Sequence, residues 1–253
     1  MSSDQEVILA SLNTHGGRGA DGQAYDLAAA CRQLKADIIA LQEVWRPHGE
    51  PNPVDEIASA LGAEAFEADL RSDTDLRSQG ISGETARGRW GLAVLTTMPV
   101  AHGEVADLGR TPGDPIRRVA QLITVDIPGG GRFRVANTHL THLVASPVQL
   151  LRLVRHLTAA DVPTVIAGDL NMPLPVTGVA AGYAPAVIGR TYPAARPVVQ
   201  LDHVLADSRV TRCGGDVLAP AGSDHLPIRA RLRLGSTRCA GDRSGPGRPN
   251  PQH

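Results

Sequence analysis

The sequence is poor in aromatic residues, cysteine and long apolar runs, and each shortage narrows the possibilities. Aromatic residues make up 3% of the 253 residues, so the chain shows no series of stacking platforms for bases. Its cysteines, Cys31, Cys213 and Cys239, are odd in number and lack zinc-ligand spacing, so we expect a reduced, cytoplasmic protein. No run approaches the roughly 18 apolar residues of a membrane helix, and the N-terminus lacks the basic and apolar regions of a signal peptide.

Positive charge is not in excess either. The chain has 25 Lys and Arg against 26 Asp and Glu, a formal net charge of −1. Proteins that depend on non-specific DNA binding usually carry a basic surplus, so the total does not favour strong duplex binding. Lys35 is the only lysine; the bias towards arginine suits phosphate contacts and also fits genome composition. A nuclease stays an alternative because several arginines could form a local basic strip, namely Arg71, Arg77, Arg87 and Arg89.

Three catalytic motifs are missing. The chain has no His-Glu-x-x-His arrangement for zinc, no Gly-x-Ser-x-Gly nucleophile elbow and no Gly-x-x-x-x-Gly-Lys loop for a nucleoside triphosphate. These absences argue against zinc peptidases, serine esterases and P-loop enzymes.

Short apolar runs alternate with turn residues along the chain. They predict strands over residues 7–12, 38–41, 91–97, 118–127, 133–138, 163–167, 201–206 and 226–234. Helices are predicted over about 25–35 and over 54–61, and a third begins at Ser146-Pro147, with Ser146 as its cap. In that third helix Leu150, Leu153, Val154 and Leu157 form one apolar face. Pro128-Gly129-Gly130-Gly131 predicts a hairpin turn.

The many strands and few helices favour one fold class. Hydrophobic residues make up 42% of the chain, enough for a sizeable core. We predict an α/β protein, a four-layer α/β sandwich of two packed mixed β-sheets flanked by helices; composition alone also allows a doubly wound parallel sheet. The domain is expected to span residues 1–234, and residues 235–253, rich in Gly, Pro and Arg, are expected to be a disordered tail.

Polar residues recur where the predicted strands end. They are Asn13, Glu43, His139, Asp169, Asn171, Asp224 and His225. Taken singly, each is also what an ordinary turn or strand end contains. Taken together, their carboxylates and amides are hard oxygen ligands that favour Mg²⁺ or Mn²⁺, and histidines beside aspartates exchange protons near neutral pH. This combination indicates metal-assisted hydrolysis of a phosphate ester.

The ordered motifs of the chain resemble those of the endonuclease/exonuclease/phosphatase (DNase I-like) superfamily. The resemblance runs from about Val7 to Leu234 and rests on Ser11-Leu12-Asn13, Leu41-Gln42-Glu43, Trp90 to Leu95, Asn137-Thr138-His139-Leu140, Gly168-Asp169-Leu170-Asn171, Leu201-Asp202-His203-Val204-Leu205 and Gly222-Ser223-Asp224-His225. It implies the sandwich fold and Mg²⁺- or Mn²⁺-dependent attack of water on phosphorus.

The resemblance also implies a role for each matched residue. Glu43 is expected to be the principal metal ligand, with Asn13 beside the metal and Asp224 completing that side. Asp169 is expected to ligate or orient the attacking water and Asn171 to hydrogen-bond the phosphoryl oxygens. Asp202 is expected to hold His225, a general base or an electrostatic partner of the phosphate. His139 is expected to act as an acid towards the leaving group, and no glutamate that supports it can be placed.

Arg117 or Arg118 resembles a phosphate-contacting arginine, although a solvated pair at a strand start is an equal reading. The histidine at 139 resembles DNase-like, sphingomyelinase-like and phosphatase-like members, and Thr191-Tyr192-Pro193 resembles sphingomyelinase-like and small bacterial phosphodiesterases.

The favoured hypothesis is a phosphodiesterase acting on a phosphoester substrate, with nucleic acids and phospholipid headgroups as candidates. The alternatives are a nuclease acting on DNA or RNA, a phosphomonoesterase and, least favoured, a catalytically dead binding module. No protein partner is implied.

Overall fold

The fold is taken from a computed structural model of the chain. The structure describes residues 6–81, 86–142, 144–158 and 161–234. The expected disordered tail over 235–253 lies outside the described residues, and the domain boundary at 234 stays a prediction.

The described chain forms two six-stranded mixed sheets. The first has the order β11-β12-β1-β2-β4-β3 and the second the order β5-β6-β7-β8-β10-β9. Sheet one contains β1 Glu6–Asn13, β2 Ile38–Pro47, β3 Glu64–Thr74, β4 Gly88–Thr96, β11 Val210–Val217 and β12 Ile228–Leu234. Sheet two contains β5 Val100–Gly109, β6 Arg118–Asp126, β7 Arg132–His139, β8 Thr164–Asp169, β9 Tyr183–Pro185 and β10 Asp202–Asp207.

In the part of the chain that the structure describes, three α-helices and three short 3-10 helices accompany the sheets. They are α1 Leu27–Leu34, α2 Pro53–Leu61, α3 Ser146–Leu157, η1 His15–Gly17, η2 Arg77–Gln79 and η3 Leu174–Val179. The helix predicted from Ser146 is confirmed, and its apolar face is buried. The capping role of Ser146 was wrong: Ser146 is the first helical residue, and the cap position is Ala145, which has no side chain that can accept a hydrogen bond. The 128–131 turn is confirmed, with a hydrogen bond from Gly130 N–H to the Ile127 carbonyl.

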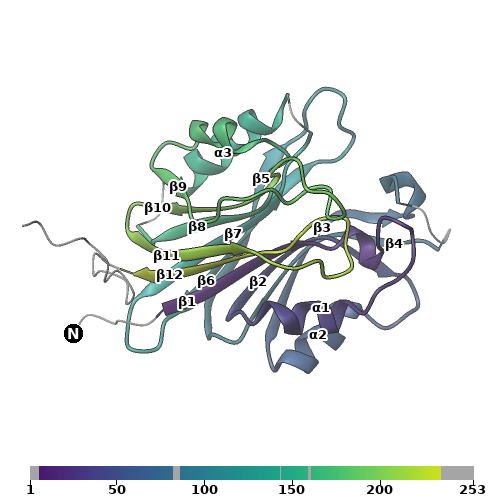
Figure 1. Cartoon of the computed structure of the whole chain (residues 1–253), viewed down its shortest axis with the longest axis horizontal. Coiled ribbons are helices and arrows are strands. Elements are labelled where there is room, and N and C mark those ends of the chain that lie inside the picture. Colours follow the sequence, from purple (N-terminus) through teal and green to yellow (C-terminus); the bar gives the residue numbers. More distant parts are fainter. Residues whose placement is uncertain (1–5, 82–85, 143, 159–160, 235–253) are drawn as a thin grey trace, which may run out of the picture.

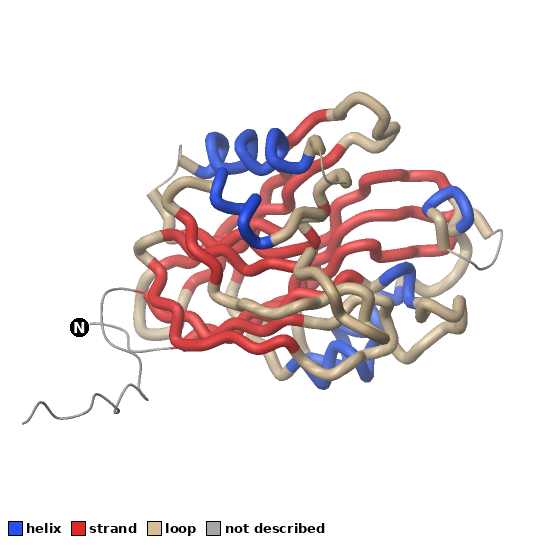
Figure 2. The backbone as a smooth tube through the Cα atoms, turned by 45° about the horizontal axis from the view of Figure 1, so that its top comes forward, coloured by secondary structure: helices blue, strands red, loops and turns tan. Residues whose placement is uncertain are grey.

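The layers follow from alternation along the strands. One face of each sheet buries aliphatic residues against the other sheet, as Leu9 and Ala40 do against Val135 and Val165. The outer face of sheet one packs on α1 and α2, and the outer face of sheet two packs on α3. Figure 1 shows α1 and α2 below the strands and α3 above them, and Figure 2 shows the strands as the central layers between the helices. The predicted four-layer sandwich is confirmed.

The sheet registers bring distant segments to one edge. In sheet two His139, the last residue of β7, lies beside Asp169, the last residue of β8. Asp202 begins the antiparallel strand β10 and also lies beside Asp169. In sheet one β1 and β2 are parallel, and Asn13 lies beside Gln42. The carboxyl ends of β1, β7 and β8, the middle of β2 and the start of β10 therefore meet at the same end of the sandwich.

Cys213 is disulfide-bonded, which departs from the expectation of a fully reduced chain, whereas Cys31 is free and buried under sheet one. None of the helices in the described part of the chain has the length and apolar character to cross a bilayer.

Candidate active site

Asn13 links the two sheets through carboxylates. Its Nδ2 donates to Glu43 Oε1 at 3.0 Å and to Asp169 Oδ2 at 3.0 Å. Its Oδ1 accepts from the His15 backbone N–H at 3.0 Å. An amide group that donates to two acids partly balances two negative charges, so Asn13 holds together the carboxylates on which metal binding would depend.

Glu43 lies on an irregular part of β2. The pairing of β2 with β4 shifts between Leu41 and Val44, and Glu43 has a φ of +55°, a conformation that is uncommon for a residue other than glycine. The bulge turns the side chain of Glu43 towards the strand ends. Burial raises the pKa of Glu43 to about 7; the Asn13 hydrogen bond opposes this rise, and the Asp169 carboxylate adds to it.

His225 is held between carboxylates. Its Nδ1 lies 2.8 Å from Asp202 Oδ2 and its Nε2 lies 3.8 Å from Asp169 Oδ2. Burial lowers the pKa of His225, but the charges of Asp202 and Asp169 outweigh burial and raise it to about 10. Imidazolium is therefore the form of this side chain at neutral pH.

The loop that precedes Asp202 fixes this histidine. The Thr191 hydroxyl accepts from the backbone N–H groups of Leu201 and Asp202 at 3.1 and 3.3 Å. The ring of Tyr192 packs on the ring of His225, with centroids 4.7 Å apart. Ser223 completes the support, since its hydroxyl donates to the Asn13 carbonyl at 2.7 Å.

His139 has the opposite environment. Burial and the nearby Arg118 guanidinium lower the pKa of His139 to about 3, against a smaller opposing effect of Asp169. Its Nε2 lies 3.0 Å from Asn171 Nδ2, and its buried Nδ1 has no hydrogen-bond partner. Asn171 has a φ of +52°, and its backbone N–H donates to Asp169 Oδ1 at 2.9 Å. His139 is thus a neutral side chain at pH 7.

The two candidate arginines have different surroundings. Arg118 is buried; its Nε donates to Asp114 Oδ2 at 2.9 Å and its Nη1 to the His139 carbonyl at 3.3 Å. Arg117 is exposed and pairs with Asp107. The structure brings Arg118, and not Arg117, to the predicted site.

Among the described residues, two groups of side chains place ligand atoms close enough for one cation. They are Glu43, His139 and Asp169, and Asp169, Asp202 and His225, with all ligand atoms of each group within 4.8 Å of one another. Asp202 Oδ1 is buried and has no hydrogen-bond partner among the described residues. The carboxylate oxygens of these groups fit Mg²⁺ or Mn²⁺, and each group adds one histidine nitrogen. Asp224 belongs to neither group; it lies 3.6 Å from His15 Nδ1 at the rim.

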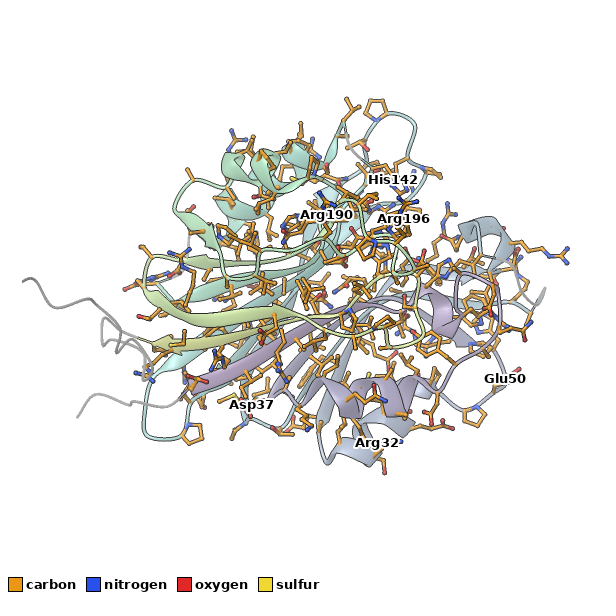
Figure 3. The ribbon with its side chains drawn as sticks, in the orientation of Figure 1. Arg32, Asp37, Glu50, His142, Arg190 and Arg196 are labelled. Atoms are coloured by element: carbon orange, nitrogen blue, oxygen red, sulfur yellow. The ribbon has the colours of Figure 1, made fainter. Side chains whose placement is uncertain are left out.

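A cavity of about 600 Å³ opens beside Glu43 and His139. Its walls include Arg118, Trp90 and His142. In Figure 3 the labelled His142 lies in the upper part of the view, and Asp37, the residue that precedes β2, lies in the lower part. The prediction gave His142 and Tyr192 no role; the only sequence feature of His142 was its place three residues after His139.

Comparisons with known proteins concern the family and the fold of the chain. A model of the Endonuclease/Exonuclease/phosphatase family matches residues 10–225. The chain is similar to an endonuclease/exonuclease/phosphatase from Beutenbergia cavernae, with 25% identity over 91% of this chain and 72% of that chain and a TM-score of 0.71.

Two further solved structures share the fold at lower identity. They are a mannosyl-6-phosphatase from Bacteroides thetaiotaomicron (15% identity, 90% of this chain and 100% of that chain, TM-score 0.71) and the human Nocturnin catalytic domain (16% identity, 92% and 96%, TM-score 0.69). No curated protein sequence matches the chain. The family match and the fold lead to one conclusion: the chain belongs to the endonuclease/exonuclease/phosphatase family.

Proposed function

We propose that the protein is a phosphoester hydrolase that depends on Mg²⁺ or Mn²⁺ and prefers phosphodiesters. The observation that supports this most strongly is the convergence of Glu43, Asp169 and the Asp202–His225 pair at one end of the sandwich, around the Asn13 amide. Acids and histidines that lie far apart in sequence meet there within hydrogen-bonding distance.

Glu43 and Asp169 are the residues that would hold the cation, with Asn13 beside them and Asp224 adding negative charge from the rim. When bound, the cation neutralises the phosphoryl oxygens. The cation would also remove the repulsion between the substrate phosphate and the two carboxylates. Substrate binding requires this, because the substrate and the acidic centre are both anionic.

The side chains divide the remaining work. His225, kept as imidazolium by Asp202, suits electrostatic binding of a phosphoryl oxygen better than proton abstraction. Asp169 is the group placed to orient the attacking water. The lowered pKa of His139 favours hydrogen bonding over its expected role as an acid. Asn171 would bind a phosphoryl oxygen only after exchanging one of its present partners.

The cavity next to His139 favours a diester over a monoester. A volume of about 600 Å³ accommodates a second ester group beside the phosphorus. The alternative, a nuclease, loses support from the surface: Arg87 pairs with Asp73, and Arg89 lies 4.0 Å from Asp69. The arginine strip that kept this alternative open is therefore partly neutralised.

The proposal is tested by hydrolysis of bis-p-nitrophenyl phosphate and p-nitrophenyl phosphate with Mg²⁺, Mn²⁺ or EDTA. Faster metal-dependent turnover of the diester, lost in Glu43→Ala and His225→Ala and kept when exposed Glu50 is changed to Gln, supports a phosphodiesterase. Preference for the monoester would indicate a phosphatase. Full activity of Glu43→Ala would contradict the site assignment.

Two further assays separate the alternatives. Cleavage of DNA that falls steeply with salt would favour a nuclease, because phosphate contacts release counterions. Isothermal titration with Mn²⁺ tests the dead-module alternative: no heat of binding that depends on Glu43 would support a scaffold without catalysis.

A further inference from the structure

His142 contacts the site through Asn171 without belonging to the acidic centre. Its Nδ1 lies 3.0 Å from Asn171 Oδ1. The Asn171 Nδ2 group lies 3.0 Å from the Leu140 carbonyl and 3.0 Å from His139 Nε2. These contacts form a continuous row from the exposed His142, through one amide, to buried His139.

The Leu140 carbonyl decides which way this amide points. A carbonyl oxygen only accepts, so the atom of Asn171 that faces it must be the donor Nδ2. Asn171 Oδ1 then faces His142, whose Nδ1–H donates to it. Both hydrogens of Nδ2 are engaged, one by Leu140 and one by His139, so His139 accepts at Nε2.

Without His142, one end of the amide would be released. Asn171 Oδ1 has no hydrogen-bond donor among the described residues besides His142, and the backbone of Asn171 is held by Asp169 in a left-handed conformation. Rotation of the freed side chain would move the Asn171 Nδ2 group that faces His139.

We propose that His142 is a positioning residue of the active site, which fixes the Asn171 amide and through it the orientation of His139. The inference rests on the proposed hydrolase function for its kinetic readout alone. His142 is exposed and lies three residues after the end of β7 (Figure 3), so substitutions there are expected to leave the buried layers intact.

A matched set of variants tests this role. In His142→Asn the amide nitrogen replaces Nδ1 and keeps a donor at the place that Asn171 requires, whereas in His142→Gln the donor replaces Nε2; His142→Ala removes both. With bis-p-nitrophenyl phosphate, His142→Ala and His142→Gln are expected to lower kcat about tenfold with KM within about twofold, and His142→Asn to restore most of kcat. Equal melting temperatures exclude a folding defect.

The side-chain amide resonances of Asn171, assigned with Asn171→Asp, give a readout that needs no activity. They are expected to shift in His142→Ala and to return towards wild type in His142→Asn. If the wild type hydrolyses neither ester, the proposed function fails while this readout still tests the positioning role. Rescue by Gln instead of Asn, equal loss in all three variants, no loss in any, or unmoved Asn171 resonances would each overturn the proposal.

Discussion

The two sides of the active site differ in charge although each is built around a buried histidine. On the side of β10 and β12, His225 lies between Asp202 and Asp169, and its pKa is raised to about 10. On the side of β7, His139 lies near Arg118, and its pKa is lowered to about 3. The same side chain is therefore cationic at one flank of the acidic centre and neutral at the other.

The contrast shows that charged neighbours decide whether the pKa-lowering effect of burial prevails. Burial lowers the pKa of both histidines. Asp202 reverses that effect for His225, whereas Arg118 reinforces it for His139. The Asn171 amide adds to the difference, because protonated His139 would direct an N–H at an N–H. A cationic flank suits a phosphoryl oxygen, and the neutral flank adjoins the cavity proposed for the second ester group.

The largest effect is expected from removing the carboxylate that makes the flanks differ. Asp202→Asn keeps the shape but loses the negative charge, so the pKa of His225 falls and kcat drops about 10³-fold. Steady-state hydrolysis of bis-p-nitrophenyl phosphate measures this, with the thermal melt as the control. A kcat within threefold of wild type would show that the charge on His225 is unimportant.

The next effect concerns the two neighbouring arginines. Arg118→Gln is expected to lower kcat/KM about 10²-fold, because a buried donor at the neutral flank is lost, while Arg117→Gln stays within about twofold. Arg118→Lys keeps the charge and loses the planar fork, so intermediate activity is expected. Equal losses in Arg117→Gln and Arg118→Gln would contradict the assignment of Arg118 to the site.

Glu43 provides a test of stability in the metal-free protein. The pKa of Glu43 is raised from 4.5 to about 7, so between these pH values the folded state holds a proton that the unfolded state releases. The contribution of Glu43 to the free energy of unfolding is therefore complete below pH 4.5 and is lost as pH rises through 7. Glu43→Gln should therefore raise the free energy of unfolding at pH 8 in EDTA by about 2–3 kcal/mol, with little gain at pH 5. Chemical denaturation measures this gain, with Glu50→Gln as the control variant. No gain at pH 8 would show that the pKa of Glu43 is not raised in the folded protein.

A smaller effect of the opposite sign is expected from His139. The pKa of His139 is lowered from 6.5 to about 3. Its contribution to the free energy of unfolding is therefore complete above pH 6.5 and is lost as pH falls towards 3. When the pH is lowered from 6.5 to 5, the free energy of unfolding should fall by about 1–2 kcal/mol less in His139→Gln than in the wild type. Chemical denaturation in EDTA measures this difference. An unchanged pH dependence would mean that His139 titrates normally when folded.

The sequence predicted the central strands of the two sheets but not their edge strands. Every predicted strand corresponds to an inner strand, whereas β3, β5, β9 and β11, the four edges of the two sheets, were not predicted. An edge strand such as β5 is exposed along most of its length and carries no apolar run. Periodicity therefore identifies strands that are buried on both sides and misses those that border solvent.

The residues predicted for the site lie close together in the structure, but the sequence did not indicate how they are arranged, and their roles stay predictions. Asp169 ends β8 and Asp202 begins β10, and their register brings them together. Glu43 lies at the bulge inside β2, and His225 lies in the loop before β12. The choice between Arg117 and Arg118, the rim position of Asp224 and the contact of His142 with Asn171 depend on loop conformation. Such contacts leave no periodic pattern in the chain.

The difference between the two flanks is tested most directly by following the imidazole resonances of both histidines in the metal-free protein from pH 4 to 9, with assignments from His139→Gln and His225→Gln. The account predicts that His225 stays protonated up to pH 8 and that His139 stays neutral down to pH 5. Titration of both rings near 6.5 would contradict it.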